Sequence, residues 1–326
     1  MMPNNSDSAK TFALPSSPKR VVIGHDQHAE MAAALLRDRS DLEVRNRKLA
    51  DITVDDFEWG ETYLGFRRPA LPTMGNIRWV HSTGAGVDPW LYPNELPSNI
   101  LLTRSSESFG PMIAEWAVAR ALAFTQRLSE LSVSQHDKHW QKIDIPMLAG
   151  STALVIGTGD VGAHVGKLFK ALGCVVRGIS RSGRGDNEIF SKVSPVSEIA
   201  GAVAGADWII VVLPLTNETR GLINRDVLSQ CTGAVIMNAG RGPVITEGAL
   251  PEALQQGWLR GAALDVFEVE PLPTSSPLWT DERVMVSPHI AGLTTVEGAV
   301  SGFVEVLGDL ENARAPRWIV SRERQY

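Results

Sequence analysis

The sequence predicts an α/β fold in which two doubly wound parallel sheets form two domains. Short apolar runs of strand length alternate with helical patterns along most of the chain, and strands that are joined through helices lie parallel in one sheet. The length of 326 residues is sufficient for two domains of ordinary size. A hydrophobic content of 44% and a charged content of 21% are typical of a globular chain with a sizeable core.

The first domain is expected to follow a polar N-terminal segment. Residues 1–18 have no apolar centre like that of a signal peptide, so we interpret them as a flexible lead. Arg20–Gly24 has the pattern of a buried strand. A helix follows, and its expected apolar face consists of Met31, Ala34, Leu35 and Leu42. Further strands of this domain are expected at 42–44, 79–82 and 100–103.

A long helix is expected from Pro111, a residue that suits the first turn of a helix, to about Leu131. Apolar residues surround its middle, and this pattern indicates burial on several sides, either between domains or in a subunit interface. The polar and aromatic segment 132–149 is expected to be a loop.

The second domain begins at Ser151, and its strands are expected at 153–156, 174–176, 208–213, 233–237, 261–265 and 284–287. One helix, from Val296 to about Leu310, remains after these strands, and the simplest topology returns it to the first domain. The predicted domains are therefore 19–110 with 293–326, and 111–292, with a cleft between the two lobes.

The turn after the first strand of the second domain has the glycine spacing of a dinucleotide-binding, Rossmann-like site. We expect Gly157 to permit the turn, Gly159 to let a pyrophosphate approach the backbone, and Gly162 to let helix and strand pack closely. The N-terminus of the following helix would bind the phosphates. The candidate cofactor-binding residues of this turn are Gly157, Thr158, Gly159, Asp160, Val161 and Gly162.

The end of the next strand favours NADP(H) over NAD(H). An NAD site usually has Asp or Glu there to bind the ribose hydroxyls, whereas this chain has Ser180 followed by Arg181 and Arg184. Serine does not repel a 2′-phosphate, and guanidinium groups bind phosphate through paired hydrogen bonds. The alternative is that both arginines are solvated side chains on a surface turn.

Composition and charge argue against several classes of partner. The formal net charge of −6 disfavours nucleic acid and anionic membranes. No apolar run approaches the roughly 18 residues of a membrane span. Cys174 and Cys231 lie in apolar surroundings, which indicates a reducing compartment, and we expect a cytoplasmic protein. His136 and His139 have a spacing that suits a metal, but no third ligand is evident, so no metal site is predicted.

Arg241, Glu270 and His289 each follow a strand pattern in the second domain. Ligands of open parallel sheets bind outside the carboxyl ends of the strands, so all three residues could face one crevice. Arg241 can bind a carboxylate and an adjacent carbonyl oxygen, and His289 can donate a proton to that oxygen. Glu270 would stabilise the imidazolium and raise its pKa. Each residue alone has a structural alternative, as a hydrogen-bonded histidine, a solvated turn carboxylate or an ordinary loop arginine.

A glycine-rich turn in the first domain is a candidate anion site. Gly84, Ala85 and Gly86 follow the strand 79–82 and offer backbone N–H groups to a substrate carboxylate. Trp140 is a candidate wall of the substrate pocket.

These motifs together resemble those of the D-isomer-specific 2-hydroxyacid dehydrogenases. The matching stretches stand in the family's order and include 82–88 (STGAGVD), 213–223 (LPLTNETRGLI), 238–242 (NAGRG), 263–273 (ALDVFEVEPLP) and 287–292 (SPHIAG). Within the family the chain is most similar to bacterial NADPH-dependent glyoxylate/hydroxypyruvate reductases. The shared details are His139-Trp140-Gln141 and Ser180-Arg181.

The resemblance implies hydride transfer between NADP(H) and a small 2-oxo or D-2-hydroxy acid, with glyoxylate or hydroxypyruvate favoured. It implies that Arg241, Glu270 and His289 are the catalytic set and that Asp265 contacts the nicotinamide amide. It also implies a homodimer joined largely through 111–148. The further cofactor-binding residues that it implies are Pro214, Thr219, Ala239 and Asp265.

Two alternatives remain open. The same residues could act on a bulkier branched or aromatic 2-oxo acid, because 25–72, on the substrate side, matches the family only loosely. The chain could instead be a nucleotide-sensing binding protein, like the corepressors among the family's relatives. The three intact catalytic residues and the missing basic patch argue against this second alternative.

Overall fold

The computed structural model describes residues 17–105 and 109–326. The chain divides into two compact units, Met1–Ser108 with Thr294–Tyr326, and Phe109–Leu293. The predicted N-terminal lead, residues 1–18, lies outside the described residues except for its last two.

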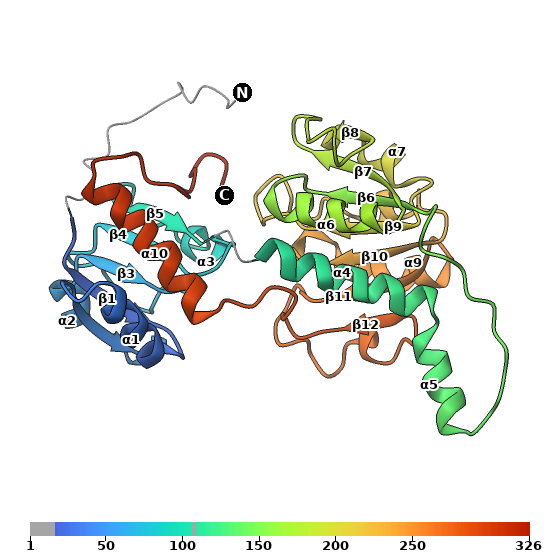
Figure 1. The fold of residues 1–326 in the computed structure, drawn as a ribbon, viewed down its shortest axis with the longest axis horizontal. Coiled ribbons are helices and arrows are strands. Elements are labelled where there is room, and N and C mark those ends of the chain that lie inside the picture. The colour runs from blue at the N-terminus through green and yellow to red at the C-terminus, as the bar shows by residue number, and fades with distance from the viewer. Residues whose placement is uncertain (1–16, 106–108) are drawn as a thin grey trace. The chain divides into compact units, whose positions relative to one another are not determined.

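The first unit is a five-stranded parallel sheet with helices on both faces (Figure 1). Its elements are β1 Arg20–Gly24, α1 His28–Asp38, β2 Glu43–Arg47, α2 Val54–Trp59, β3 Thr62–Leu64, β4 Trp79–Ser82, α3 Asp88–Leu91, β5 Leu101–Arg104 and α10 Val296–Glu311. The strand order is β2-β1-β3-β4-β5. Successive residues of β1 enter opposite cores, because Val21 and Ile23 pack with α1 and α10 while Val22 packs with α2 and α3.

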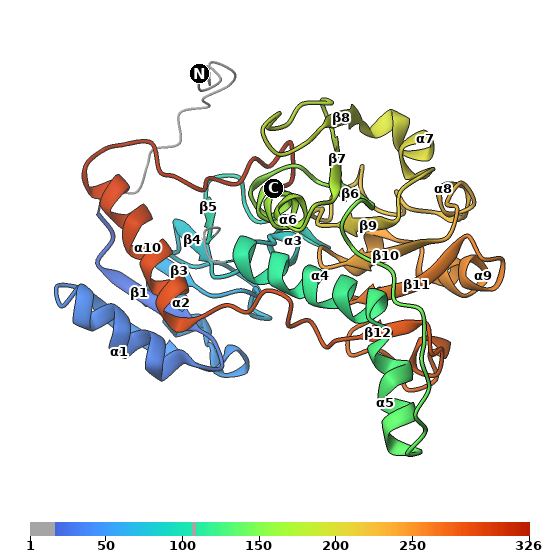
Figure 2. The same ribbon diagram turned by 45° about the vertical axis from the view of Figure 1, so that its right-hand side comes forward.

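The last helix of the chain, α10, completes one core of the first unit. Thr295 caps the helix, and its hydroxyl accepts a hydrogen bond from the N–H of Gly298 at 3.0 Å. Phe303 stacks on Trp79 of β4 with ring centroids 4.6 Å apart. Figures 1 and 2 show α10 lying beside α1, so the two helices cover one face of the sheet together.

The second unit is a seven-stranded parallel sheet with the order β12-β11-β10-β9-β6-β7-β8. Its strands are β6 Thr152–Ile156, β7 Val175–Ser180, β8 Lys192–Pro195, β9 Trp208–Val211, β10 Ala234–Asn238, β11 Leu259–Leu264 and β12 Val284–Val286. Its helices are α4 Phe109–Thr125, α5 Leu128–His136, α6 Asp160–Ala171, α7 Ile199–Val203, α8 Arg225–Leu228 and α9 Leu250–Gln255. The two parallel sheets confirm the predicted α/β fold class.

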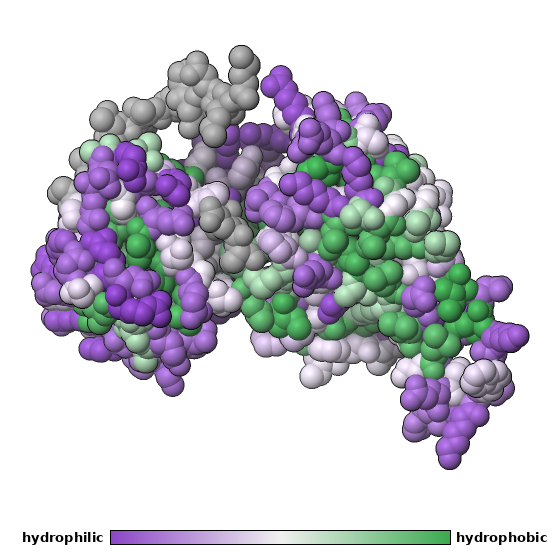
Figure 3. Space-filling model, in the orientation of Figure 1, coloured by the Kyte–Doolittle hydropathy of each residue, from purple (hydrophilic) through white to green (hydrophobic). Residues whose placement is uncertain are grey.

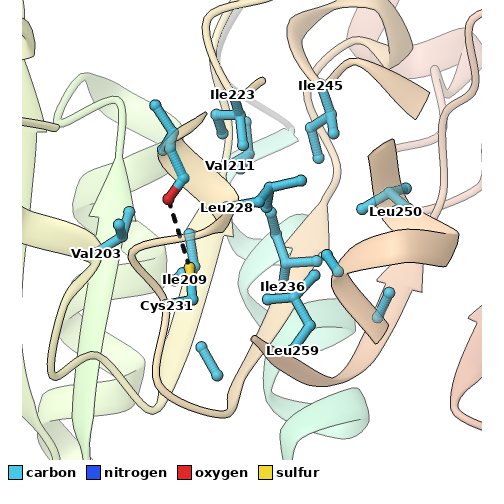
Figure 4. Packing of buried hydrophobic residues seen from close by; sticks show 14 of the residues in the cluster. Val203, Ile209, Val211, Ile223, Leu228, Cys231, Ile236, Ile245, Leu250 and Leu259 are labelled. Atoms are coloured by element: carbon cyan, nitrogen blue, oxygen red, sulfur yellow. Dashed lines mark hydrogen bonds between the residues drawn. The ribbon is translucent and has the colours of Figure 1, made fainter. Parts of the chain in front are cut away.

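One face of this sheet is sealed by a core that α7, α8 and α9 share with the strands (Figure 4). Ile209 of β9 and Ile236 of β10 point from the sheet toward Leu228 of α8 and Leu250 of α9. Cys231 lies in the same core, where burial raises the pKa of its thiol to about 11. Both Cys231 and Cys174 are buried and free.

The structure corrects the predicted helix 111–131 and the loop predicted after it. The first helix, α4, ends at Thr125, and Arg127 has a left-handed backbone with φ of 50°. A second helix, α5, then continues to His136, through part of the predicted loop. The apolar pattern continues across Arg127 without a glycine or proline, so it carried no sign of the break.

In the first unit, one strand was not predicted and one predicted helical face was wrong. The strand β3, only three residues long, was not predicted, although it lies between β1 and β4. The helix α1 ends at Asp38, so Leu42 is not part of its face. Leu42 nevertheless packs in the same core as Met31, which explains why its spacing resembled that of a helix.

The turn between β6 and α6 contains two glycines that a side chain would affect differently. A Cβ on Gly162 would lie 1.8 Å from the carbonyl oxygen of Gly157, whereas a Cβ on Gly159 would meet no atom within 4 Å. We therefore expect Gly162→Ala to destabilise the second unit by about 1–3 kcal/mol, and Gly159→Ala by less than about 1 kcal/mol. Thermal unfolding followed by circular dichroism tests this pair. Equal melting temperatures for the two variants would contradict the packing described here.

Candidate active site

The carboxyl ends of the strands in the second unit carry most of the predicted site residues. The chain runs from β6 outward to β7 and β8, and then returns to the other side of β6 with β9. The strand order therefore reverses between β6 and β9. Ligands of open parallel sheets bind outside the carboxyl ends of the strands at such a reversal.

The turn after β6 is open at the N-terminus of α6. Gly157 has a φ of +109°, which favours glycine, and the position of a Cβ on Gly159 is unobstructed. Gly159 is the N-cap of α6 and places no side chain on the first N–H groups of the helix. These N–H groups, which follow Thr158 and begin with Asp160 and Val161, suit the pyrophosphate of a dinucleotide.

The loop after β7 is shaped by two hydroxyl groups. Ser180 Oγ donates to the carbonyl oxygen of Arg184 at 2.8 Å and accepts from the N–H of the same residue at 3.0 Å. Thr158 Oγ1 donates to that carbonyl oxygen as well, at 3.1 Å. The side chains of Arg181 and Arg184 are exposed on this fixed loop, and β7 ends in a hydroxyl where an NAD site usually has a carboxylate. This donor set fits a phosphorylated ribose.

The loop after β9 is held by a pair of threonines. Thr219 Oγ1 donates to the carbonyl oxygen of Pro214 at 2.7 Å and accepts from the N–H of Thr216 at 2.8 Å. Thr216 Oγ1 in turn accepts from the N–H of Thr219 at 3.1 Å. The predicted cofactor residues Pro214 and Thr219 are thus joined directly. Thr216 was not predicted, although threonine hydroxyls commonly bond to nearby backbone in turns.

Asn238, which was not predicted, fixes the loop that carries Ala239 and Arg241. Asn238 is 1% exposed, its Oδ1 accepts from the N–H of Gly240 at 3.1 Å, and its Nδ2 donates to the carbonyl oxygen of Arg241 at 3.1 Å. The half-buried Arg241 follows β10, and Ala239 is half-buried directly after the strand.

His289 and Glu270 form a hydrogen-bonded pair at the ends of β12 and β11. His289 Nδ1 lies 2.8 Å from Glu270 Oε2, and the other oxygen of Glu270 accepts from the N–H of Phe267 at 3.1 Å. Burial alone would raise the pKa of Glu270, but these two hydrogen bonds and the positive charges of His289 and Arg241 outweigh it, so the pKa lies below its usual value. A carboxylate at this position keeps the proton of the imidazole on Nδ1 and directs Nε2 away from Glu270.

Asp265 is buried against the loop of residues 287–292, which follows β12 and is called the histidine loop below. Its side chain is 1% exposed, and its carboxylate accepts from the N–H groups of Ile290 at 3.0 Å and Ala291 at 2.8 Å. Its backbone carbonyl oxygen accepts from the N–H of His289 at 2.8 Å. Asp265 therefore holds the backbone of His289 and of the two residues after it, a contact that the sequence did not reveal. Its predicted contact with the nicotinamide stays a prediction.

In the first unit, the carbonyl oxygens of Gly84, Ala85 and Gly86 lie within reach of two side-chain donors, Ser82 and Arg104. Ser82 Oγ lies 3.4 Å from the carbonyl oxygens of Gly84 and Gly86, and Arg104 Nη1 donates to that of Ala85 at 3.3 Å. The single proton of the Ser82 hydroxyl serves one of its two carbonyl oxygens at a time, so these side chains occupy two acceptors of the loop and leave its N–H groups to other partners. Arg104, at the end of β5, was not predicted.

Trp140 lies on the segment after α5, and its side chain is 94% exposed. Figure 1 shows that α5 and this segment extend away from the sheet of the second unit. Because its side chain is almost fully exposed, Trp140 does not pack against the strand-end residues in the described part of this chain.

In 17–105 and 109–326, no three His, Cys, Asp or Glu side chains gather where they could hold a metal ion. In the same ranges, no helix is both long and apolar enough to cross a membrane.

Comparison with known proteins identifies relatives of the chain. Residues 118–291 match the family model described as "D-isomer specific 2-hydroxyacid dehydrogenase, NAD binding domain". The glyoxylate/hydroxypyruvate reductase A of Serratia proteamaculans is 32% identical over 263 residues, which cover 77% of this chain and 82% of the relative. The corresponding reductase of an Enterobacter species is also 32% identical, over 83% of this chain and 89% of the relative.

Solved structures resemble the chain over nearly its full length. A D-isomer-specific 2-hydroxyacid dehydrogenase from Xanthobacter autotrophicus, in complex with NADPH and MES, has a TM-score of 0.86 and 32% identity, and the match covers 95% of this chain and all of that one. An NADPH-dependent glyoxylate/hydroxypyruvate reductase from Sinorhizobium meliloti, in complex with NADP and sulfate, has a TM-score of 0.85 and 26% identity over 94% of this chain and all of that one.

Proposed function

Because the chain belongs to the D-isomer-specific 2-hydroxyacid dehydrogenase family, we propose that it reduces a small 2-oxo acid to the corresponding 2-hydroxy acid, of D configuration where that product is chiral, with NADPH, and that glyoxylate and hydroxypyruvate are its preferred substrates. Family membership makes the chain an NAD(P)-dependent oxidoreductase of 2-hydroxy acids. The observation that supports the proposal is the 2.8 Å contact between His289 Nδ1 and Glu270 Oε2, because it leaves Nε2 of a carboxylate-bound imidazole facing away from Glu270, as a proton donor to a substrate requires.

The residues of the chain supply a proton and positive charge to the reaction. When bound, the reduced nicotinamide supplies a hydride to the carbonyl carbon of the substrate. His289 Nε2–H donates its proton to the carbonyl oxygen as negative charge develops there, and the oxygen becomes the hydroxyl of the product. Glu270 stabilises the imidazolium before this transfer. Arg241 binds the substrate carboxylate and the carbonyl oxygen through its guanidinium group.

The loop formed by Gly84, Ala85 and Gly86 supplies backbone N–H donors to the substrate carboxylate in this proposal. Its support is that Ser82 and Arg104 engage two carbonyl oxygens of the loop. A small 2-oxo acid gains most from such donors, because its carboxylate is a large part of the molecule.

The preference for NADPH is supported by the loop after β7. Ser180 presents no negative charge to a 2′-phosphate, and Arg181 and Arg184 are exposed on a backbone that Ser180 and Thr158 fix. Two structural relatives, from Xanthobacter autotrophicus and Sinorhizobium meliloti, are in complex with NADPH and NADP respectively.

The proposed assembly is a homodimer joined through α4, α5 and the segment after them. Figure 3 shows hydrophobic residues gathered along α4 and the start of α5 on the face in view. Exposed apolar side chains of this region include Leu128 at 52%, Val133 at 61%, Trp140 at 94% and Met147 at 79%.

The proposed dimer is tested by sedimentation equilibrium, which should give twice the mass of the chain. Val133→Asp should shift the mass toward that of one chain, because it places a charge in the proposed apolar contact. Val175→Asp, at a comparably exposed valine of β7, is the control. A monomeric wild type would contradict this assembly.

The function is tested by following NADPH and NADH oxidation against a panel of 2-oxo acids. Glyoxylate and hydroxypyruvate should give the highest kcat/KM, above branched and aromatic 2-oxo acids. His289→Ala should lower kcat by about 10²–10⁴-fold, because the positioned proton donor is lost. The dissociation constant of NADPH, measured by fluorescence, should stay unchanged in this variant. A wild type that binds NADPH and is inert on every acid would instead favour a nucleotide-sensing protein.

The cofactor preference is tested by replacing the two arginines. Arg181→Ala with Arg184→Ala should raise the KM for NADPH much more than the KM for NADH, because only NADPH has the phosphate that guanidinium groups bind. Lys167→Ala, at an exposed cation of α6, controls for the loss of positive charge. Equal effects of the double substitution on the two cofactors would remove the basis for NADPH preference.

A further inference from the structure

The helix α4 reaches the histidine loop through one buried hydrogen bond. Trp116, in the middle of α4, is 6% exposed, and its Nε1 donates to Ser287 Oγ at 3.0 Å. Ser287 is 5% exposed and stands two residues before His289. No step of the proposed reaction uses either residue.

Donor and acceptor roles are fixed in the two hydrogen bonds of Ser287 Oγ, one with Trp116 and one with Asp265. An indole N–H can only donate, and an ionised carboxylate can only accept. Ser287 Oγ therefore accepts from Trp116 and donates its own proton to Asp265 Oδ1, which lies 2.6 Å away. The hydroxyl fills both roles at once, and an aliphatic side chain at 287 could fill neither.

Asp265 connects Ser287 to the backbone of the histidine loop through hydrogen bonds. Its Oδ1 accepts from the N–H of Ile290 as well as from Ser287, and its Oδ2 accepts from Ala291. Without Ser287, one acceptor site of a carboxylate that is 1% exposed would lose its partner, and such a loss is costly inside a protein. The loop would have to admit water or move.

The backbone of His289 makes the loop sensitive to such a change. Its φ is 55°, a left-handed conformation that costs a residue other than glycine roughly 1 kcal/mol or more. The conformation persists because the surroundings impose it, through the bonds of Asp265 to the N–H groups of residues 289, 290 and 291. The direction of the imidazole depends on this φ.

Trp116, at the other end of this series of hydrogen bonds, also contacts a cation of α4. The guanidinium carbon of Arg120, one turn along α4, lies 4.8 Å from the centre of the Trp116 ring. Burial lowers the pKa of Arg120, and the negative charge of Asp265 acts in the opposite direction. The guanidinium group of Arg120 therefore packs on the indole and interacts with the charge of Asp265.

We propose that Ser287 and Trp116 are positioning residues for His289: they hold the carboxylate of Asp265 against the loop, and thereby aim the imidazole without touching the substrate. This inference rests on the proposed role of His289 as proton donor. It gives α4 a role in positioning His289, in addition to its place in the proposed subunit contact.

The test compares Ser287→Ala with Ser287→Thr, which keeps the hydroxyl, and with Trp116→Phe, which keeps a ring but removes the donor. Ser287→Ala should lower kcat by about 10–100-fold, the effect of a misplacement of about 1 Å, and leave the KM for NADPH within about twofold. Ser287→Thr should restore most of kcat, and Trp116→Phe should lie between. In each variant, hydrogen exchange of the amides in 287–292 should rise in the same order as kcat falls.

Ser151→Ala is a matched control. Ser151 Oγ accepts from Trp208 Nε1 at 2.9 Å and donates to the carbonyl oxygen of Leu148 at 2.6 Å, at the amino ends of β6 and β9 in the same sheet. This variant should lower the melting temperature about as much as Ser287→Ala does, yet leave kcat and the exchange of 287–292 unchanged.

The inference is overturned if Ser287→Ala keeps the kcat and the loop exchange of the wild type. It is equally overturned if Ser287→Thr loses as much as Ser287→Ala, or if Ser151→Ala has the same effect on kcat, because stability alone would then explain the losses. If the wild type is inert on every 2-oxo acid, the proposed function fails, and the exchange of 287–292 still decides whether Ser287 positions the loop.

Discussion

The buried carboxylate of Asp265 is the constraint on which the candidate site depends. A charge that is 1% exposed must be fully hydrogen-bonded, and Asp265 meets this requirement with Ser287, Ile290 and Ala291. Because these partners flank His289, satisfying the charge also sets the backbone of the histidine. The need to neutralise this one buried charge thus links the end of β11 to the loop after β12. The helix α4 joins them through the bond of Trp116 to Ser287.

The neighbouring loops of the second unit follow the same principle with smaller polar groups. Ser180 holds the backbone of Arg184 after β7, Thr216 and Thr219 hold each other after β9, and Asn238 holds Gly240 and Arg241 after β10. In each loop a short side chain bonds to nearby backbone, so the loop has few alternative conformations. The long side chains proposed to bind cofactor and substrate therefore start from a rigid base, as precise positioning requires.

Local patterns in the sequence predict much of this structure, because the signals are local. Apolar runs predict most of the buried strands, and glycine spacing predicts the turn after β6. The alternation of strands and helices predicts that the strands are parallel, and the two sheets confirm this fold class. Arg127 shows the limit, since its left-handed backbone splits a continuous apolar pattern into α4 and α5. The contact of Trp116 with Ser287 joins residues 171 positions apart, and no local spacing encodes it. Glu270 and His289 could be grouped only because parallel strands end at one edge.

The central claim is that the held loop presents Nε2 of His289 to the oxo group of a 2-oxo acid. The most direct measurement is a crystal structure of the protein with NADPH and oxamate, a 2-oxo acid analogue that is not reduced. The account predicts Nε2 within hydrogen-bond distance, about 3.2 Å or less, of the oxygen that replaces the oxo group, while Nδ1 stays on Glu270. An analogue bound on the nicotinamide with the imidazole turned away, and another group on that oxygen, would contradict it.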